Sequence, residues 1–127
     1  MKRRNFNRGQ SIIEVVVALA SVILVILALV KVTTISIKNA SFARDQRLAT
    51  QYAQKAIENA RRLKEEEPLV FWSKSGEEDI SGLEERFTGK INYNEVENDK
   101  KMEVKVLVFW TDEKGQHESK LTTFFTK

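Results

Sequence analysis

The strongest constraint on this chain is an apolar run close to its N-terminus. Among residues 12–30, only Glu14 and Ser21 are not apolar. An α-helix of this length rises about 28 Å, close to the hydrocarbon thickness of a bilayer. The run therefore predicts a transmembrane helix. Glu14 is its anomaly, because an ionisable side chain inside a membrane helix is unfavourable and marks a functional site by default.

The segment before the run is basic. Residues 1–9 carry four Lys and Arg residues and no acidic residue. A short basic segment beside a membrane helix stays in the cytoplasm, which predicts the orientation of the helix. A secretory signal peptide fits less well, because its apolar region is about 7–15 residues long and its small-residue cleavage site follows that region. Here the small-residue pattern, residues 18–20, lies in the middle of the run.

The sequence GQSIIE at residues 9–14 resembles the class III signal of type IV pilins and pseudopilins. In that family a membrane peptidase cuts after the glycine, methylates the new N-terminus and leaves a glutamate at mature position five. The resemblance implies cleavage between Gly9 and Gln10, N-methylation of Gln10 and an assembly role for Glu14, the fifth residue from Gln10. The common pattern has phenylalanine and threonine where this chain has Gln10 and Ser11, although Ser11 keeps the hydroxyl.

The helix is expected to continue far beyond the membrane. No proline or glycine lies between Gln10 and Glu67, and Pro68, the only proline, should end the helix at or before Glu67. We therefore divide it into a transmembrane and assembly helix at residues 10–31 and an extension at residues 32–67. An apolar stripe with helical spacing follows the membrane segment and must pack on another element: Phe42, Ala49, Tyr52, Ala53, Ala56, Ile57, Ala60 and Leu63.

Residues 68–127 predict a connector followed by three antiparallel strands. Residues 102–110 alternate most clearly between apolar and polar side chains, and residues 87–93 and 118–125 are the other expected strands. In the connector, the apolar residues 69–72 are expected to cover the edge of the core. One apolar face of a sheet and one apolar helix stripe bury each other. The predicted fold class is therefore α+β, with a long N-terminal transmembrane helix packed by its C-terminal half on a small antiparallel sheet, as in the pilin fold.

The charge balance gives no support for direct binding to nucleic acid. The whole chain has a net charge of +3 and a pI near 9.2. Four of its 21 Lys and Arg residues lie in the basic leader, so the remainder carries 17 against 18 Asp and Glu. The basic pI is therefore no sign of a nucleic-acid-binding domain. The chain has no cysteine, which excludes disulfides, thiol nucleophiles and Cys-ligated zinc.

Catalytic motifs are not recognisable. His117 is the only histidine, and we expect it to be exposed beside a turn, without a Ser/His/Asp arrangement or metal motif. The acidic residues at 77–79 and 84–85 match no calcium loop and are interpreted as a solvated surface. Trp72 and Trp110 are interpreted as core or partner contacts. No enzyme activity, metal or cofactor is expected.

A second resemblance concerns the C-terminal hairpin. A strand ending in Trp110, a turn with Asp112 and Gly115, and a strand with Leu121 look like the last hairpin of minor pilins of the PilV type and of GspI-type pseudopilins. The two resemblances imply a minor pilin of a type IV pilus, with prepilin peptidase, an assembly platform and other pilins as partners. The alternative is a minor pseudopilin of a type II secretion or DNA-uptake system. A membrane-anchored binding module that never assembles is the rival from another class.

The resemblance also implies where the protein resides. The chain is expected to cross the cytoplasmic membrane once, with the leader at residues 1–9 in the cytoplasm and the C-terminal domain outside. After assembly it is expected in a surface pilus or a pseudopilus.

Overall fold

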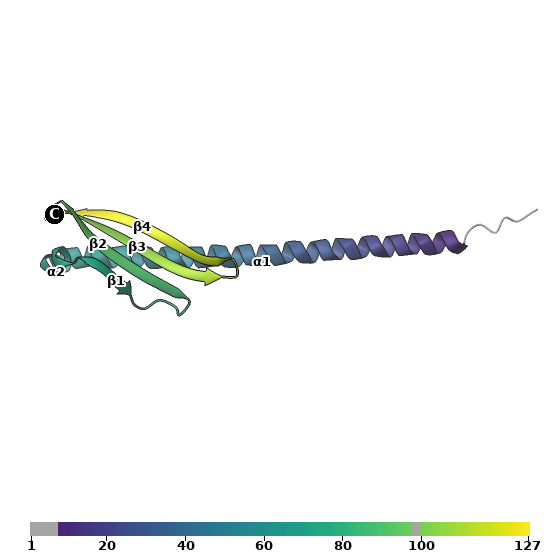
Figure 1. Cartoon of the computed structure of the whole chain (residues 1–127), viewed down its shortest axis with the longest axis horizontal. Helices are drawn as coiled ribbons and strands as arrows, with labels where there is room; N and C mark the ends of the chain where they lie inside the picture. The colour runs from purple at the N-terminus through teal and green to yellow at the C-terminus, as the bar shows by residue number, and fades with distance from the viewer. Residues whose placement is uncertain (1–7, 98–99) are drawn as a thin grey trace, which may run out of the picture. The chain divides into compact units, whose positions relative to one another are not determined.

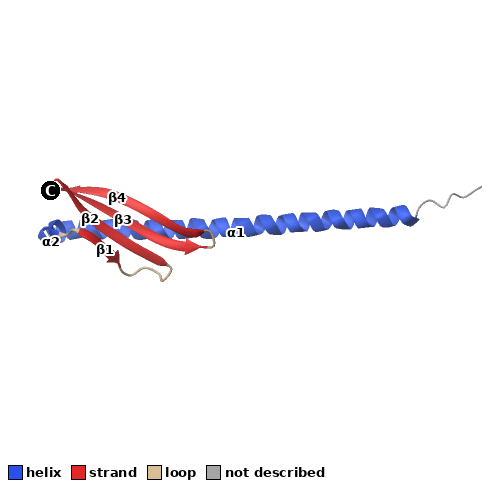
Figure 2. Cartoon of the chain, viewed as in Figure 1, coloured by secondary structure: helices blue, strands red, loops and turns tan. Residues whose placement is uncertain are grey.

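The computed structural model of the chain describes residues 8–97 and 100–127 (Figures 1 and 2). The elements in chain order are α1 (Arg8–Glu66), α2 (Pro68–Ser73), β1 (Gly76–Ile80), β2 (Phe87–Glu97), β3 (Lys101–Asp112) and β4 (Gly115–Thr126). The chain divides into two compact units, Met1–Ala40 and Ser41–Lys127, so that α1 contributes to both.

The end of α1 follows from Pro68. Glu67 still donates its backbone N–H to the carbonyl of Leu63 at 2.8 Å, which closes the last turn. Proline lacks this donor and has a fixed φ suited to the first turn of a helix, so Pro68 ends one helix and begins the next. The predicted end of the long helix is confirmed.

In the first unit, every described side chain at residues 11–40 is exposed. The helical span Ser11–Glu66 contains a stretch long and apolar enough to cross a membrane, and none of that stretch is buried. Its hydroxyl groups donate to carbonyls four residues earlier, as in the Ser21 Oγ bond to Val17 O at 2.8 Å and the Thr33 Oγ1 bond to Leu29 O at 2.9 Å. Such back-bonding satisfies hydroxyl groups without water, as a hydrocarbon surrounding requires.

The second unit has a four-stranded antiparallel sheet in the order β1-β2-β3-β4. Val106 of β3 lies between Ile91 of β2 and Leu121 of β4. The inward side chains of β3 are the predicted ones, and all are buried: Met102, Val104, Val106, Val108 and Trp110.

Residues 41–66 of α1 cover this face of the sheet. Four alanines of the predicted stripe, Ala49, Ala53, Ala56 and Ala60, are buried in the same cluster as the β3 side chains. Tyr52 packs edge-on against Phe87 of β2, with ring centroids 5.4 Å apart. Small side chains let the helix approach the sheet closely. The α+β arrangement, a long N-terminal apolar helix packed on an antiparallel sheet as in pilins, is confirmed.

The prediction of three strands was wrong. β1 is a fourth strand inside the expected connector, and β2 extends to Glu97, into the expected loop. β1 has a single apolar residue, Ile80, and no alternation. It is held by its ladder to β2 and by ion pairs of its acidic side chains with Lys90 and Lys74.

The expectation that residues 69–72 cover the edge of the core is met by Phe71 and Trp72, which is partly buried against the core, but not by Leu69 and Val70. Phe71 is fully buried and contacts Tyr93 and Phe125, with ring centroids 6.2 and 5.3 Å from its own. Leu69, by contrast, is 87% exposed, and Val70 is also exposed. The segment therefore inserts the Phe71 side chain into the core and leaves its two aliphatic side chains, Leu69 and Val70, on the surface.

Candidate functional site

The residues of the predicted signal begin α1. Gly9 and Gln10 lie in its first turns, and their side chains are outside the described part of the structure. Glu14 follows one turn later and is exposed. In residues 8–97 and 100–127, no hydrogen bond or ion pair involves the Glu14 carboxylate. The structure therefore places an acidic group on an apolar helix surface that offers it no partner of its own.

The surroundings of Glu14 on the helix are apolar. Its neighbours one turn toward the C-terminus are Val17 and Ala18. The next basic residue along α1 is Lys31, about 25 Å further along the helix axis. A positive group that pairs with Glu14 must therefore come from the N-terminal end of the helix or from another molecule.

The acidic residues of β1 and the loop that follows it form no cation site. Glu78 accepts two hydrogen bonds from Lys74 Nζ, at 2.7 and 2.8 Å, and Glu77 pairs with Lys90. The hydrogen bond to Glu77, and then the charge of Glu77, raise the pKa of Lys90. Within the described residues, no group of three or more His, Cys, Asp or Glu side chains has a geometry that could hold a metal ion.

His117 is half-buried, and the expectation that it is exposed was wrong. Its ring packs against Phe42 and Trp110, with centroids 4.9 and 5.4 Å away, and its Nε2 lies 2.8 Å from Asp112 Oδ1. The hydrogen bond to His117, helped by one from the backbone N–H of Lys114, lowers the pKa of Asp112. These contacts join the β3–β4 turn to α1. The geometry gives His117 a structural role.

Sequence reasoning missed one buried ion pair. Asp45 of α1 is only 6% exposed, and its Oδ1 lies 3.0 Å from Nη2 of Arg86, in an ion pair without hydrogen-bond geometry. Arg86 also stacks over Phe87, 5.1 Å from the ring centroid. Asp45 lies in phase with the apolar stripe, three residues after Phe42 and four before Ala49. The signal in the sequence was a charged residue at a position where the apolar stripe of the helix is expected to be buried.

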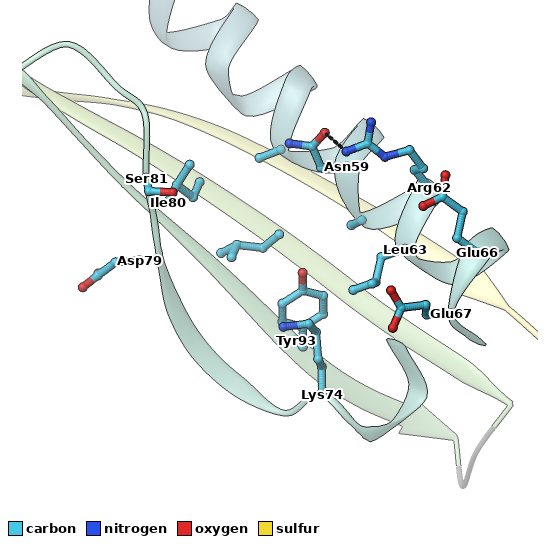
Figure 3. A pocket seen from close by; sticks show the side chains of 13 residues that line it. Asn59, Arg62, Leu63, Glu66, Glu67, Lys74, Asp79, Ile80, Ser81 and Tyr93 are labelled. Carbon is cyan, nitrogen blue, oxygen red and sulfur yellow. Dashed lines mark hydrogen bonds between the residues drawn. The ribbon is translucent and has the colours of Figure 1, made fainter. Parts of the chain in front are cut away.

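A groove of about 450 Å³ lies between the C-terminal turns of α1 and strand β1 (Figure 3). Tyr93 stands on its floor with the hydroxyl directed into it, and Lys74 Nζ lies 5.2 Å from the Tyr93 ring centroid. Burial, and secondarily Glu78, raises the pKa of Tyr93. The rim carries both charge signs, and neither histidine nor cysteine lines the groove. The charged side chains of the rim on α1 and just after it are Arg62, Glu66 and Glu67.

Comparisons with known proteins do not identify the chain. No family model, no curated protein and no solved structure matches it. The candidate site is therefore defined by the chain's own residues, Gly9, Gln10 and Glu14, and by the apolar helix that carries them.

Proposed function

We propose that this protein is a minor pilin of a type IV pilus. A prepilin peptidase cuts the chain between Gly9 and Gln10, and the subunit then joins the fibre through its N-terminal helix. The observation that carries the proposal is Glu14, which has no hydrogen bond or ion pair among the described residues. It lies on an apolar and unburied helix segment, at the spacing from Gly9 that the pilin signal has. The self-contained α+β unit at Ser41–Lys127 supports it, because pilins carry such a unit after the helix.

Cleavage supplies the positive group that Glu14 lacks. The new N-terminus on Gln10 is an α-amine with a reference pKa of about 7.7–8.0, mostly cationic at neutral pH. Within one subunit the amine lies one helical turn from Glu14, and side-by-side packing of helices brings the amine of one subunit to Glu14 of another. Leaving one such charge unpaired in a low-dielectric surrounding costs about 3–5 kcal/mol. This penalty selects the subunits that enter a fibre.

The first experiment tests cleavage. Intact-mass analysis of the protein extracted from membranes of cells with an active prepilin peptidase should show a chain that begins at Gln10 and carries a methyl group. Gly9→Leu should block the cut, because a side chain at this position crowds the peptidase site. A precursor mass for the wild-type chain in those cells contradicts the proposal and favours a membrane-anchored binding module.

The second experiment tests assembly. Glu14→Ala should leave cleavage and membrane insertion intact and reduce the amount of the subunit in sheared fibres. Glu14→Gln keeps the shape without the charge and should fail in the same way. Immunogold labelling should accompany the quantification, since a subunit at the fibre tip has no subunit ahead of it to pair with. Wild-type incorporation of both variants along the fibre contradicts the proposed role of Glu14.

A further inference from the structure

The sheet of the second unit has two edges of different character. β1 is five residues long and pairs only with β2, and β4 is twelve residues long and pairs only with β3, within residues 8–97 and 100–127. A strand edge with unpaired N–H and C=O groups is a template for another strand. β4 is the longer of the two templates, and its outward-facing side chains are exposed.

The two edges differ in charge. β1 presents three consecutive acidic residues at positions 77–79. β4 carries Lys120 and is followed by Lys127, and Lys64 of α1 donates to the carbonyl of Thr126 at 2.6 Å. Glu118 is the only acidic residue of β4. The β1 edge is therefore acidic, whereas β4 itself carries one lysine and one glutamate, with two further lysines at its C-terminal end.

Two of these charges lie in one row of the sheet. The register places Asp79 beside Lys90, Lys90 beside Leu107, and Leu107 beside Lys120, so all four share the face opposite α1. Asp79 and Lys120 lie at the two ends of this row, and both are exposed. Among the described residues, neither side chain forms an ion pair. The charge of Asp79 contributes to the raised pKa of Lys90 beside it, but its exposed carboxylate, like the exposed Lys120 ammonium, can still be reached by a partner beyond the edge.

We propose that β4 of one copy pairs with β1 of a second copy of this chain. Strand directions alternate across the sheet, so β1 runs antiparallel to β4. A second copy in the same orientation therefore brings its β1 antiparallel to β4 and continues the sheet. The register that extends the existing row sets Asp79 opposite Lys120, with Gly76 opposite Thr123 and Ile80 opposite Ser119.

The other pairings between two copies are less favourable. Pairing β1 with β1 sets the acidic residues at 77–79 of both copies side by side, and like charges on adjacent strands are destabilising. Antiparallel pairing of β4 with β4 reverses the direction of α1 in the second copy, which copies held by their helices in one membrane cannot adopt. This last step rests on the proposed anchoring, whereas the charge match and strand direction do not.

Cysteine cross-linking tests the contact, because the chain has no cysteine of its own. The full chain with Asp79→Cys and Lys120→Cys is expressed in membranes and oxidised. Directly opposed residues of an antiparallel pair have Cα atoms about 4.5–5.5 Å apart, within disulfide range. Inside one chain the two positions are separated by three strand spacings, about 14 Å, so an internal disulfide is excluded. We expect dimers and a ladder of higher oligomers.

Matched variants make the test specific. Coexpressing the Asp79→Cys chain with the Lys120→Cys chain should give dimers without a ladder, and neither variant alone should do so. A control with Glu78→Cys and Lys120→Cys puts the first thiol on the opposite sheet face and should cross-link at least about fivefold less. Equal yields in the control and the test variant overturn the register. Tryptophan fluorescence of each variant verifies that the second unit is folded.

Charge reversal tests the complementarity with an independent reporter. In a chain with Glu77→Cys and Thr122→Cys, the same register predicts cross-linking. Adding Asp79→Lys should lower the yield about fivefold, and adding Lys120→Asp as well should restore it. A cross-linking yield that neither change alters contradicts an ion pair between Asp79 of one copy and Lys120 of the other.

The outcomes separate this inference from the proposed function. A cleaved, membrane-inserted chain that gives no cross-link in the first variant and none in the variant with Glu77→Cys and Thr122→Cys, which keeps Asp79 and Lys120, overturns the edge contact and leaves the pilin proposal intact. A chain that cross-links but keeps its leader uncut supports the edge contact and contradicts the pilin proposal. Adducts with a protein other than this chain show that a different partner occupies the β4 edge and overturn pairing between copies.

Discussion

The two halves of α1 share one backbone conformation but differ in burial. At residues 11–40 all the side chains are exposed, whereas at residues 41–66 one stripe is buried against the sheet. The first half is apolar around its whole circumference, and the second is apolar on one side only. A single sheet face can cover a stripe but not a circumference. The first half is therefore suited to cover by lipid or by other helices, while the chain itself covers one side of the second half.

Side-chain size follows the same division. Large apolar residues dominate residues 12–30, where the surface area that they present favours a hydrocarbon surrounding. The buried positions of the second half are mainly alanines, which bring the helix axis close to β3. Equivalent substitutions in the two halves should therefore have different consequences.

The largest effect is expected from Val106→Asp, which places an unpaired charge in the fully buried centre of the sheet. The expected loss of about 5 kcal/mol or more matches the whole stability of a small domain, so cooperative unfolding should disappear. Both tryptophans lie in the second unit, so their fluorescence reports its unfolding in urea in the full-length, detergent-solubilised protein. Lys105→Asp, on the opposite face of β3, is the control and should still unfold cooperatively.

A charge in the first half of α1 should affect membrane insertion and leave the stability of the second unit unchanged. Leu24→Asp should make insertion less favourable by about 2.5–3.5 kcal/mol, because Leu24 lies near the centre of the apolar run. Carbonate extraction of membranes should release part of this variant, and the fluorescence midpoint in urea should stay unchanged. A shifted midpoint contradicts the independence of the two units.

Enlarging one alanine in each half sharpens the comparison. Ala53→Leu should destabilise the second unit by about 1–3 kcal/mol, because the side chain of Ala53 is fully buried where α1 packs on the sheet. Ala18→Leu adds the same atoms to the exposed half and should leave the urea midpoint unchanged. Equal midpoints for both variants would mean that the helix–sheet contact is looser than described.

The smallest effect concerns the pH dependence of the second unit. The pKa of folded Asp112 lies below its ordinary value, chiefly because of the hydrogen bond to His117. The ionised carboxylate therefore contributes its full stabilisation above about pH 4, and the contribution is lost as the pH falls through the lowered pKa. Asp112→Asn should unfold at slightly lower urea concentration than wild type at pH 6, and the gap should narrow toward pH 3. A gap that is constant with pH contradicts this role.

Much of this architecture is predictable from the sequence, because single residues determine it. Pro68 alone determines the end of α1, and the strict alternation around Val106 determines which face of β3 is buried. β1 was missed because glutamate and aspartate have low strand propensity and only Ile80 is apolar. Its pairing depends on Lys90 and Lys74, which lie elsewhere in the chain.

The site is less predictable than the fold. The burial of Asp45 depends on Arg86, 41 residues later, and the burial of His117 depends on Phe42 of α1. Such tertiary contacts leave little trace in local periodicity. Glu14 stands out in the sequence because of its apolar surroundings, but its partner lies outside the described contacts, so its role remains a prediction.

The most direct test of the division is the stability of a fragment that comprises residues 41–127. The fragment retains the buried helix stripe and all four strands. It should be soluble without detergent and unfold cooperatively in urea, with the same free energy of unfolding as the second unit of the full-length protein within about 0.5 kcal/mol. A fragment that aggregates, or unfolds without cooperativity, would show that residues 1–40 are part of the folding unit and would contradict the account.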